Sequence, residues 1–273
     1  RMSPRNTEVL EAVPFDCLTL ANNHVLDWGV GGLRETLDIL DGRGIGRCGA
    51  GTDPSGAAAP WQRLLPGGQT LSVFGVGDRS SGIPKDWATR DDRPGVFLKP
   101  GNRSLEAHLE ATAGGVIVAS IHWGENWGYA IPSRQQNIAR NLIDRAGVTV
   151  VHGHSSHHPK GIELYHGGII IYGAGDFIND YEGIGGHERY RPELTAGYIV
   201  DTRPDSRRVA GVELLVFRLH RMRLHRASSA ETAWMAETIE RVSPEGRARF
   251  RPGEAGSIMV GPGESSEDEA STG

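Results

Sequence analysis

The chain has 273 residues, and at roughly 150 residues per domain this length predicts one large domain or two small ones. Hydrophobic residues make up 38% and charged residues 23%, a composition that can bury a core and excludes a wholly disordered chain. The formal net charge of −5 argues against a nucleic-acid-binding protein that works through a basic face. With 11 histidines and only two cysteines, any bound metal would have nitrogen and oxygen ligands.

The first 151 residues alternate short apolar segments with helical patterns. The predicted elements are strands over 15–20, 45–51, 71–76, 115–121 and 148–151, and helices over 31–40, 103–112 and 132–146. Residues 79–103 are rich in Arg, Asp, Gly and Pro, which predicts a long surface segment. Alternating apolar strands and helices are typical of parallel βαβ units in an α/β fold.

After residue 160 the pattern changes to consecutive strands. These are predicted over 162–165, 169–172, 197–200 and 209–219, with a hairpin turn over 166–168 and a last helix over 230–242. We expect one domain over residues 1–260 and a disordered acidic tail over 261–273. No apolar run approaches the ~18 residues of a membrane helix, and the residues before the first strand lack the apolar h-region typical of a signal peptide. Cys17 and Cys48 are expected to be free, buried thiols.

Polar side chains gather where the apolar strands end. They are Asn22, Asn23, His24 and Asp27 after the first strand, His122, Trp123 and Glu125 after GVIVASI, His152, His154, His157 and His158 after TVV, and Asp176 after IIIYGAG. In open α/β sheets, ligands and catalytic groups collect beyond the carboxyl ends of the strands, so these groups can converge on one site. Imidazole and oxygen ligands together suit Zn, Fe, Mn or Ni.

Each of these groups also has a purely structural interpretation. A single histidine at a strand end, such as His24 or His122, is more often a structural hydrogen-bonding group than a ligand, and a histidine-rich turn is often part of the surface. The presence of three such groups at strand ends in one chain favours metal binding or catalysis. Trp123, Trp127 and Tyr129 could line a substrate site or equally cover an edge of the sheet.

Four segments give the sequence a family resemblance: ANNHVLDWG, SIHWGEN, GHSSHHPKGIELYHGGIIIYGAGDFINDYEG and RMRLHRAS. Together they resemble the CapA family of bacterial poly-γ-glutamate capsule-synthesis proteins, which has the calcineurin-like metallophosphoesterase fold. The resemblance covers residues 15–242 and implies a four-layer αββα sandwich in which helices flank two mixed β-sheets.

The resemblance also implies roles for individual residues. Asn23, His122, His154 and His157 match metal-binding positions, and His24 matches the histidine that hydrogen-bonds or protonates the reacting phosphate group. Asn23 and Asp27 are counted with His24 as candidate catalytic residues. The implied cofactors are divalent Mn, Fe or Zn ions. The family opens with Gly-Asp and Asn-Leu-Glu motifs that are not found ahead of Asn22, so we expect the chain to lack its first βαβ portion and to bind metal weakly or at one site.

The expected function is therefore that of a CapA-like protein of capsule polymer synthesis with a metal-dependent phosphoesterase-type site. The alternative is a non-catalytic binding or scaffolding component of a polymer synthesis and export complex, because fold alone does not establish a reaction. A weaker alternative is hydrolysis of amide bonds in the polymer. The expected partners are a phosphorylated or polymer-related substrate and other capsule-synthesis membrane proteins, with no nucleic acid. The location stays open between cell envelope and cytoplasm.

Overall fold

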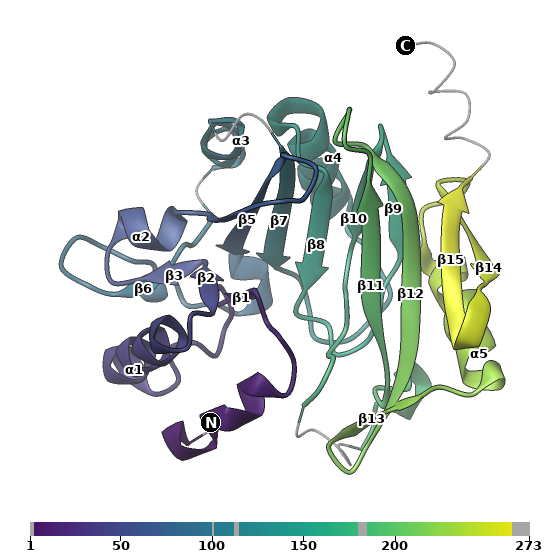
Figure 1. Ribbon diagram of the computed structural model, residues 1–273, viewed down its shortest axis with the longest axis horizontal. Coiled ribbons are helices and arrows are strands. Elements are labelled where there is room, and N and C mark those ends of the chain that lie inside the picture. The colour runs from purple at the N-terminus through teal and green to yellow at the C-terminus, as the bar shows by residue number, and fades with distance from the viewer. Residues whose placement is uncertain (1–2, 100, 112–114, 180–184, 264–273) are drawn as a thin grey trace.

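The computed structural model describes residues 3–99, 101–111, 115–179 and 185–263, and it contains two main β-sheets that face each other (Figure 1). Six strands form the first sheet, in the order β4 (Trp61–Leu64), β5 (Thr70–Gly77), β7 (Val116–His122), β8 (Val150–His154), β10 (Gly168–Ile171) and β9 (Ile162–Tyr165). The four central strands are parallel and the two edge strands antiparallel, so this sheet is mixed, as predicted. The parallel strands end at one edge of the sheet, which is where the site lies.

The second sheet is antiparallel throughout. Its strands are β11 (Leu194–Thr202), β12 (Val209–His220), β15 (Ser257–Pro262) and β14 (Ala248–Pro252), with β13 (Arg223–Arg226) also paired to β12. Along β12 buried residues alternate with more exposed ones, because only one face of the sheet covers the core. That face packs against the first sheet through an apolar layer that includes Ile169, Ile171, Leu214 and Val216.

Three helices, α3, α4 and α5, pack against the two sheets and complete the apolar core. α3 (Asn102–Glu110) and α4 (Ser133–Ala146) cover the other face of the first sheet through Leu105, Leu109 and Leu142. α5 (Ser229–Val242) contributes Met235 and Ile239 to the layer between the sheets. The result is an α/β sandwich of two sheets with flanking helices, which confirms the predicted α/β class. Only the first sheet is mixed, whereas two mixed sheets were expected, because every strand pair of the second sheet is antiparallel.

The amino-terminal part forms a smaller group of elements beside the β4–β5 edge (Figure 1). It contains η1 (Pro4–Glu11), β1 (Cys17–Thr19), α1 (Gly29–Gly42), β2 (Gly46–Cys48), β3 (Ala50–Gly51), α2 (Pro54–Ala58) and β6 (Gly95–Val96). β1 pairs with β2 in parallel, and β3 pairs with β6 antiparallel. The remaining short helices are η2 (Arg79–Ser81), η3 (Lys85–Trp87), η4 (Glu188–Tyr190) and η5 (Glu254–Gly256).

Most predicted elements are present within a few residues of their expected ends, because their apolar periodicity was strong. The hairpin over 166–168 joins β9 to β10, as expected. The β14–β15 hairpin was missed, and β15 includes Gly261 and Pro262, the first two residues of the expected tail. Residues 264–273 of that tail, and Thr112 at the expected end of α3, lie outside the described residues.

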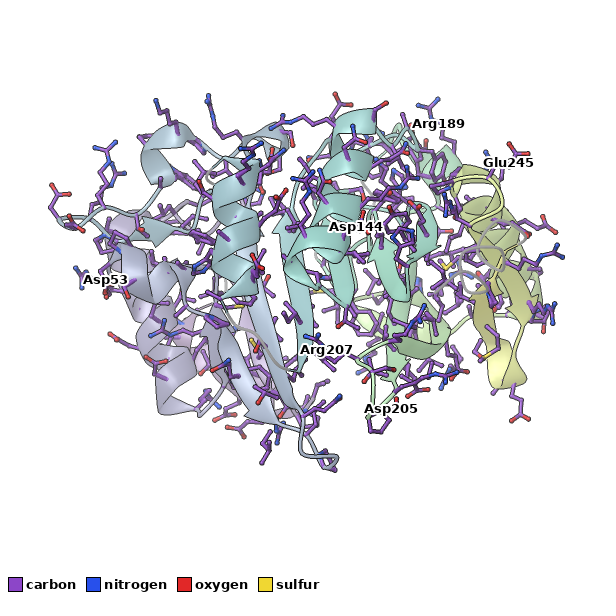
Figure 2. The ribbon with its side chains drawn as sticks, turned by 90° about the horizontal axis from the view of Figure 1, so that it is seen from above. Asp53, Asp144, Arg189, Asp205, Arg207 and Glu245 are labelled. Carbon is purple, nitrogen blue, oxygen red and sulfur yellow. The ribbon has the colours of Figure 1, made fainter. Side chains whose placement is uncertain are left out.

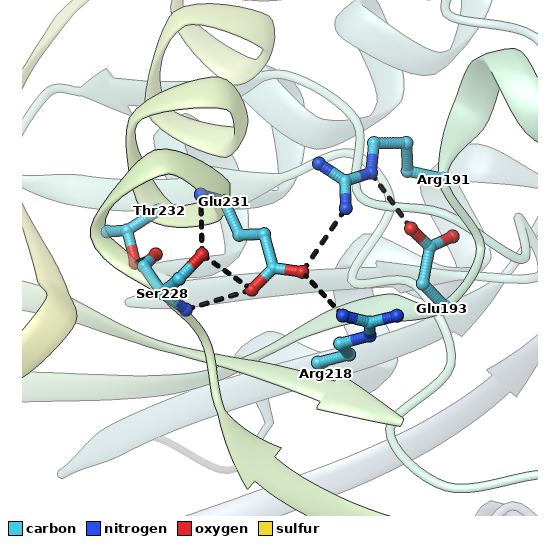
Figure 3. Close-up of polar contacts among 6 residues, drawn as sticks. All are labelled: Arg191, Glu193, Arg218, Ser228, Glu231 and Thr232. Atoms are coloured by element: carbon cyan, nitrogen blue, oxygen red, sulfur yellow. Dashed lines mark hydrogen bonds and ion pairs between the residues drawn. The ribbon is translucent and has the colours of Figure 1, made fainter. Parts of the chain in front are cut away.

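The start of α5 is determined by a capping box. The Ser228 hydroxyl accepts from the backbone N–H of Glu231, and the Glu231 carboxylate accepts from the backbone N–H of Ser228 at 2.9 Å (Figure 3). The same carboxylate lies 3.3 Å from Arg191 and 3.4 Å from Arg218. This arrangement joins the first turn of α5 to β12 and to the segment ahead of β11.

The charged side chains of Asp53 and Glu245 lie at opposite ends of the long axis of the molecule (Figure 2). None of the helices within the described ranges combines the length and the apolar character needed to cross a membrane.

Candidate functional site

The candidate site is a chain of hydrogen-bonded side chains at the carboxyl ends of β7 and β8. These parallel strands pair Ser120 with His152 and His122 with His154. Residues two apart on a strand point to the same side, so all four side chains share one face. The register of the two strands therefore brings three imidazoles and a hydroxyl together.

The contacts run from the surface inward. His122 Nε2 lies 3.0 Å from Asn23 Oδ1, and His122 Nδ1 lies 2.9 Å from His154 Nδ1. Ser120 Oγ lies 3.1 Å from His154 Nε2 and 3.0 Å from His152 Nδ1. We call these five side chains the imidazole chain: Asn23, His122, His154, Ser120 and His152.

The amide oxygen of Asn23 orders the protons of the imidazole chain. Because this oxygen only accepts, His122 donates through Nε2 and accepts through Nδ1. His154 must then donate through Nδ1 and accept through Nε2 from the Ser120 hydroxyl, which in turn accepts from His152. This assignment requires His122 and His154 to be neutral, because each of them accepts a hydrogen bond through one ring nitrogen.

The environment of the chain favours the neutral form. Burial lowers the pKa of His122 to about 4, and the neighbouring His24 and His157 lower it as well. Burial also lowers the pKa of His152 to about 4. The pKa of His154 lies well below its usual value because of burial and the adjacent His152 and His122.

Two further histidines approach the chain, and each is held by a carboxylate. His24 follows β1 in a turn closed by its backbone N–H, which donates to Asn22 Oδ1 at 2.8 Å, and its Nδ1 lies 2.8 Å from Asp27 Oδ2. His24 and Asp27 are both exposed. His157 Nδ1 lies 2.9 Å from Asp176 Oδ2, which also accepts from Asn179.

The predicted site residues are thus partly joined by direct contacts. Asn23, His122 and His154 contact one another in sequence, while His24 and His157 are near His122 and bonded to their own carboxylates. His158 points away: it is fully buried, its Nε2 accepts from the Gly128 backbone N–H at 3.1 Å, and its ring stacks on Tyr190.

Three residues of the site were either missed from the sequence or given no specific role. Ser120 lies two residues before His122, and His152 two residues before His154, so strand alternation alone could have indicated them. Asp176 was noticed at the end of β10 but had no predicted partner, because only the folded chain places it beside His157. Trp123 is buried in the core beneath α4, and its indole N–H donates to the Tyr172 carbonyl. It therefore covers the sheet, which was one of the two interpretations of this residue.

The donor types suit a divalent ion with nitrogen and oxygen ligands, because the imidazoles are neutral and an amide oxygen lies among them. The arrangement is nevertheless that of a hydrogen-bonded chain. His122 Nε2 faces Asn23, whereas His122 Nδ1 faces His154. In this arrangement, an ion bound to one of these nitrogens could not be bound by Asn23 and His154 at the same time. Within the part of the chain that the structure describes, no group of three or more His, Cys, Asp or Glu side chains could hold a metal ion.

Comparison with known proteins relates the chain to a family. The family model for the bacterial capsule synthesis protein PGA_cap matches residues 1–181. A probable polyglutamine synthesis accessory protein of Mycobacterium tuberculosis is 44% identical over 251 residues, which cover 89% of this chain and 66% of that protein. The PGA biosynthesis protein CapA of Bacillus subtilis is 31% identical over 176 residues, covering 64% of this chain and 45% of the relative.

The capsule biosynthesis protein CapA of Bacillus anthracis is 26% identical over 172 residues, covering 61% of this chain and 40% of that protein. The chain thus spans less than two thirds of the length of these relatives. Because the family model covers residues 1–181 of 273, the chain belongs to the PGA_cap family of bacterial capsule synthesis proteins.

Proposed function

We propose that this protein acts in the synthesis of a poly-γ-glutamate-type capsule polymer and that the imidazole chain forms its functional site. The observation that carries the proposal is the convergence of Asn23, His122 and His154 from three separate segments at the carboxyl edge of the first sheet. Polar groups gathered at such an edge are typical of ligand and catalytic sites in α/β proteins. The named relatives support the choice of pathway.

We further propose a metal-dependent phosphoesterase-type activity for the site. Asn23, His122, His154 and His157 would hold a divalent Mn, Fe or Zn ion, whose role when bound is to stabilise negative charge on a phosphoryl group and lower the pKa of water. His122 and His154 supply neutral nitrogens without the loss of a proton at pH 7, which favours metal binding. The contact between His122 and His154 must be exchanged for contacts to the ion.

His24 has the arrangement of a proton-transfer group. Its Nδ1 is bonded to the Asp27 carboxylate, which favours the tautomer with the proton on Nδ1 and a lone pair on Nε2. Both side chains are exposed, so a leaving group could reach the imidazole from solvent. Asp27 would orient His24 and stabilise its charged form while His24 donates a proton to the leaving oxygen.

The second candidate is a binding role without catalysis. It is favoured by the direct contact of the histidines with one another and by the lack of a preformed metal cluster among the described residues. In this version the site holds part of the polymer or of a partner protein and carries out no turnover.

Metal binding and hydrolysis can be tested separately. Calorimetry with Mn²⁺ and Zn²⁺ should show binding that His122→Ala and His154→Ala each weaken by tenfold or more, whereas His166→Ala, at the β9–β10 turn, should bind as the unchanged protein does. With metal present, phosphomonoester and phosphodiester substrates should be hydrolysed, and His24→Ala should slow turnover without changing metal affinity. Metal binding without turnover would support the binding role, and equal affinities in all variants would refute this metal site.

A further inference from the structure

Ser120 is the one hydroxyl in the imidazole chain, and it lies among three polar atoms. The residue is 1% exposed, and its Oγ lies 3.1 Å from His154 Nε2, 3.0 Å from His152 Nδ1 and 3.4 Å from Thr19 Oγ1. A hydroxyl has one proton to donate and two lone pairs that accept, and its proton rotates about the C–O bond. Ser120 can therefore reverse the direction of its hydrogen bonds without the movement of any heavy atom.

The proposed metal site requires a change in one of the two imidazoles that contact each other. His122 donates to Asn23 through Nε2, so its Nδ1 already carries a lone pair. His154 directs its Nδ1 proton at that lone pair across 2.9 Å. A ring nitrogen that carries a proton cannot bind a metal ion, so His154 must give up its Nδ1 proton before this nitrogen can become a ligand.

His154 stays neutral in this change only if its Nε2 gains a proton and finds an acceptor for it. The atom that faces Nε2 is Ser120 Oγ. A backbone N–H in this place would hold Nε2 as an acceptor and a carboxylate would hold it as a donor, whereas a hydroxyl permits both. The residue type at position 120 thus suits a histidine that has to carry its proton on either nitrogen.

His152 completes the proton balance. In the metal-free arrangement, His152 Nδ1 donates to Ser120 and Ser120 donates to His154. In the reversed arrangement, Ser120 gives its hydroxyl proton to His154 Nε2 and takes the Nδ1 proton of His152. His152 is partly exposed and regains a proton from water at Nε2, while the Nδ1 proton of His154 leaves to water. One proton enters and one leaves, so the imidazoles stay neutral.

We propose that Ser120 is a positioning residue that, together with His152, allows His154 to move its ring proton from Nδ1 to Nε2 when the site takes up a divalent cation. The inference rests on the proposed metal site and adds the means by which His154 becomes a ligand. Ser120 and His152 act through His154 and contact neither the cation nor the substrate in this role.

Nitrogen NMR of the whole chain with isotope-labelled histidine locates the ring protons directly. We expect the His154 proton on Nδ1 in the metal-free protein and on Nε2 after addition of Zn²⁺, with the signal identified by its loss in His154→Gln. His122 should keep its proton on Nε2 in both states and serves as the internal reference. A His154 proton on the same nitrogen in both states would overturn the proposal.

Zn²⁺ calorimetry separates this role of Ser120 from a purely structural one. Ser120→Ala should weaken Zn²⁺ binding by about 10–100-fold, the usual effect of removing a hydrogen-bond partner of a metal-binding histidine, whereas Ser120→Thr keeps the hydroxyl and should restore the affinity. Ser72→Ala is the matched control and should bind as the unchanged protein does. Ser72 is also a buried serine of the first sheet, and its Oγ accepts from Gln62 at 3.0 Å.

A further variant grades the effect. His152→Phe should weaken Zn²⁺ binding by a smaller factor than Ser120→Ala, because the Ser120 hydroxyl can still donate to Thr19. Unchanged affinity in Ser120→Ala, or an equal loss in a natively folded Ser120→Thr, would refute the role of the hydroxyl. If the unchanged protein binds no Zn²⁺, the metal site and this inference fail together. If it binds Zn²⁺ with the expected proton shift but hydrolyses no phosphoester, only the proposed hydrolysis fails.

Discussion

The buried histidines should make the folded state sensitive to mild acid. His122, His152 and His158 each have a pKa of about 4 in the folded chain because burial disfavours the charged imidazole. The ordinary value of about 6.5 applies once the chain unfolds. The unfolded state therefore binds more protons between pH 4 and pH 6.5. The stabilisation that these histidines contribute is fully present above pH 6.5 and is lost as the pH falls toward 4.

The size of the effect follows from these pKa values. Between pH 7 and pH 5, a histidine whose pKa falls from about 6.5 to about 4 on folding loses about 2 kcal/mol of stabilisation. His122 and His152 belong to one hydrogen-bonded chain, and a proton on His122 Nδ1 would remove the acceptor to which His154 Nδ1 donates. Counting this chain as one group and His158 as another gives a loss of about 4 kcal/mol, a large part of a typical folding free energy of about 5–15 kcal/mol.

Urea unfolding followed by circular dichroism at pH 7, 6 and 5 measures this loss directly. The dependence of the unfolding free energy on pH should correspond to uptake of about two protons near pH 5. His158→Gln should reduce the uptake by about one proton, and His225→Gln, on the exposed strand β13, is the matched control. A change below about 1 kcal/mol between pH 7 and pH 5 would refute the reasoning.

Two substitutions test the surrounding fold by thermal unfolding. Glu163→Ala should cost about 3–5 kcal/mol, because this fully buried carboxylate accepts from Arg140 at 2.9–3.0 Å and from the Tyr172 hydroxyl at 2.7 Å; a cost below 1 kcal/mol would contradict it. Gly153→Ala should cost about 1–3 kcal/mol, since its Cβ would lie 2.7 Å from the Ile171 carbonyl, whereas Gly31→Ala, an open position in α1, should be neutral or stabilising.

The sequence by itself determined the main elements and the edge at which the polar groups collect. Apolar runs such as 116–121 and 168–171 are long enough to specify buried strands, and the helical spacing of Leu33, Leu37 and Leu40 specifies α1. Because parallel strands end at a common edge, the groups after β7 and β8 were expected to meet. The group after β1 comes from the separate β1–β2 sheet, and Asn23 joins the others through its contact with His122. The β14–β15 hairpin was missed because its strands carry polar and glycine residues that weaken the pattern.

Only the tertiary structure decided how these groups contact one another. The register of β7 against β8 sets His122 beside His154 and Ser120 beside His152, and no local pattern encodes the register between two strands separated by a helix. The pairing of His157 with Asp176 and the close approach of Gly153 to the Ile171 carbonyl likewise depend on β8 packing against β10. Residue types are local properties of the chain, whereas the direction of each ring nitrogen follows from packing between distant segments.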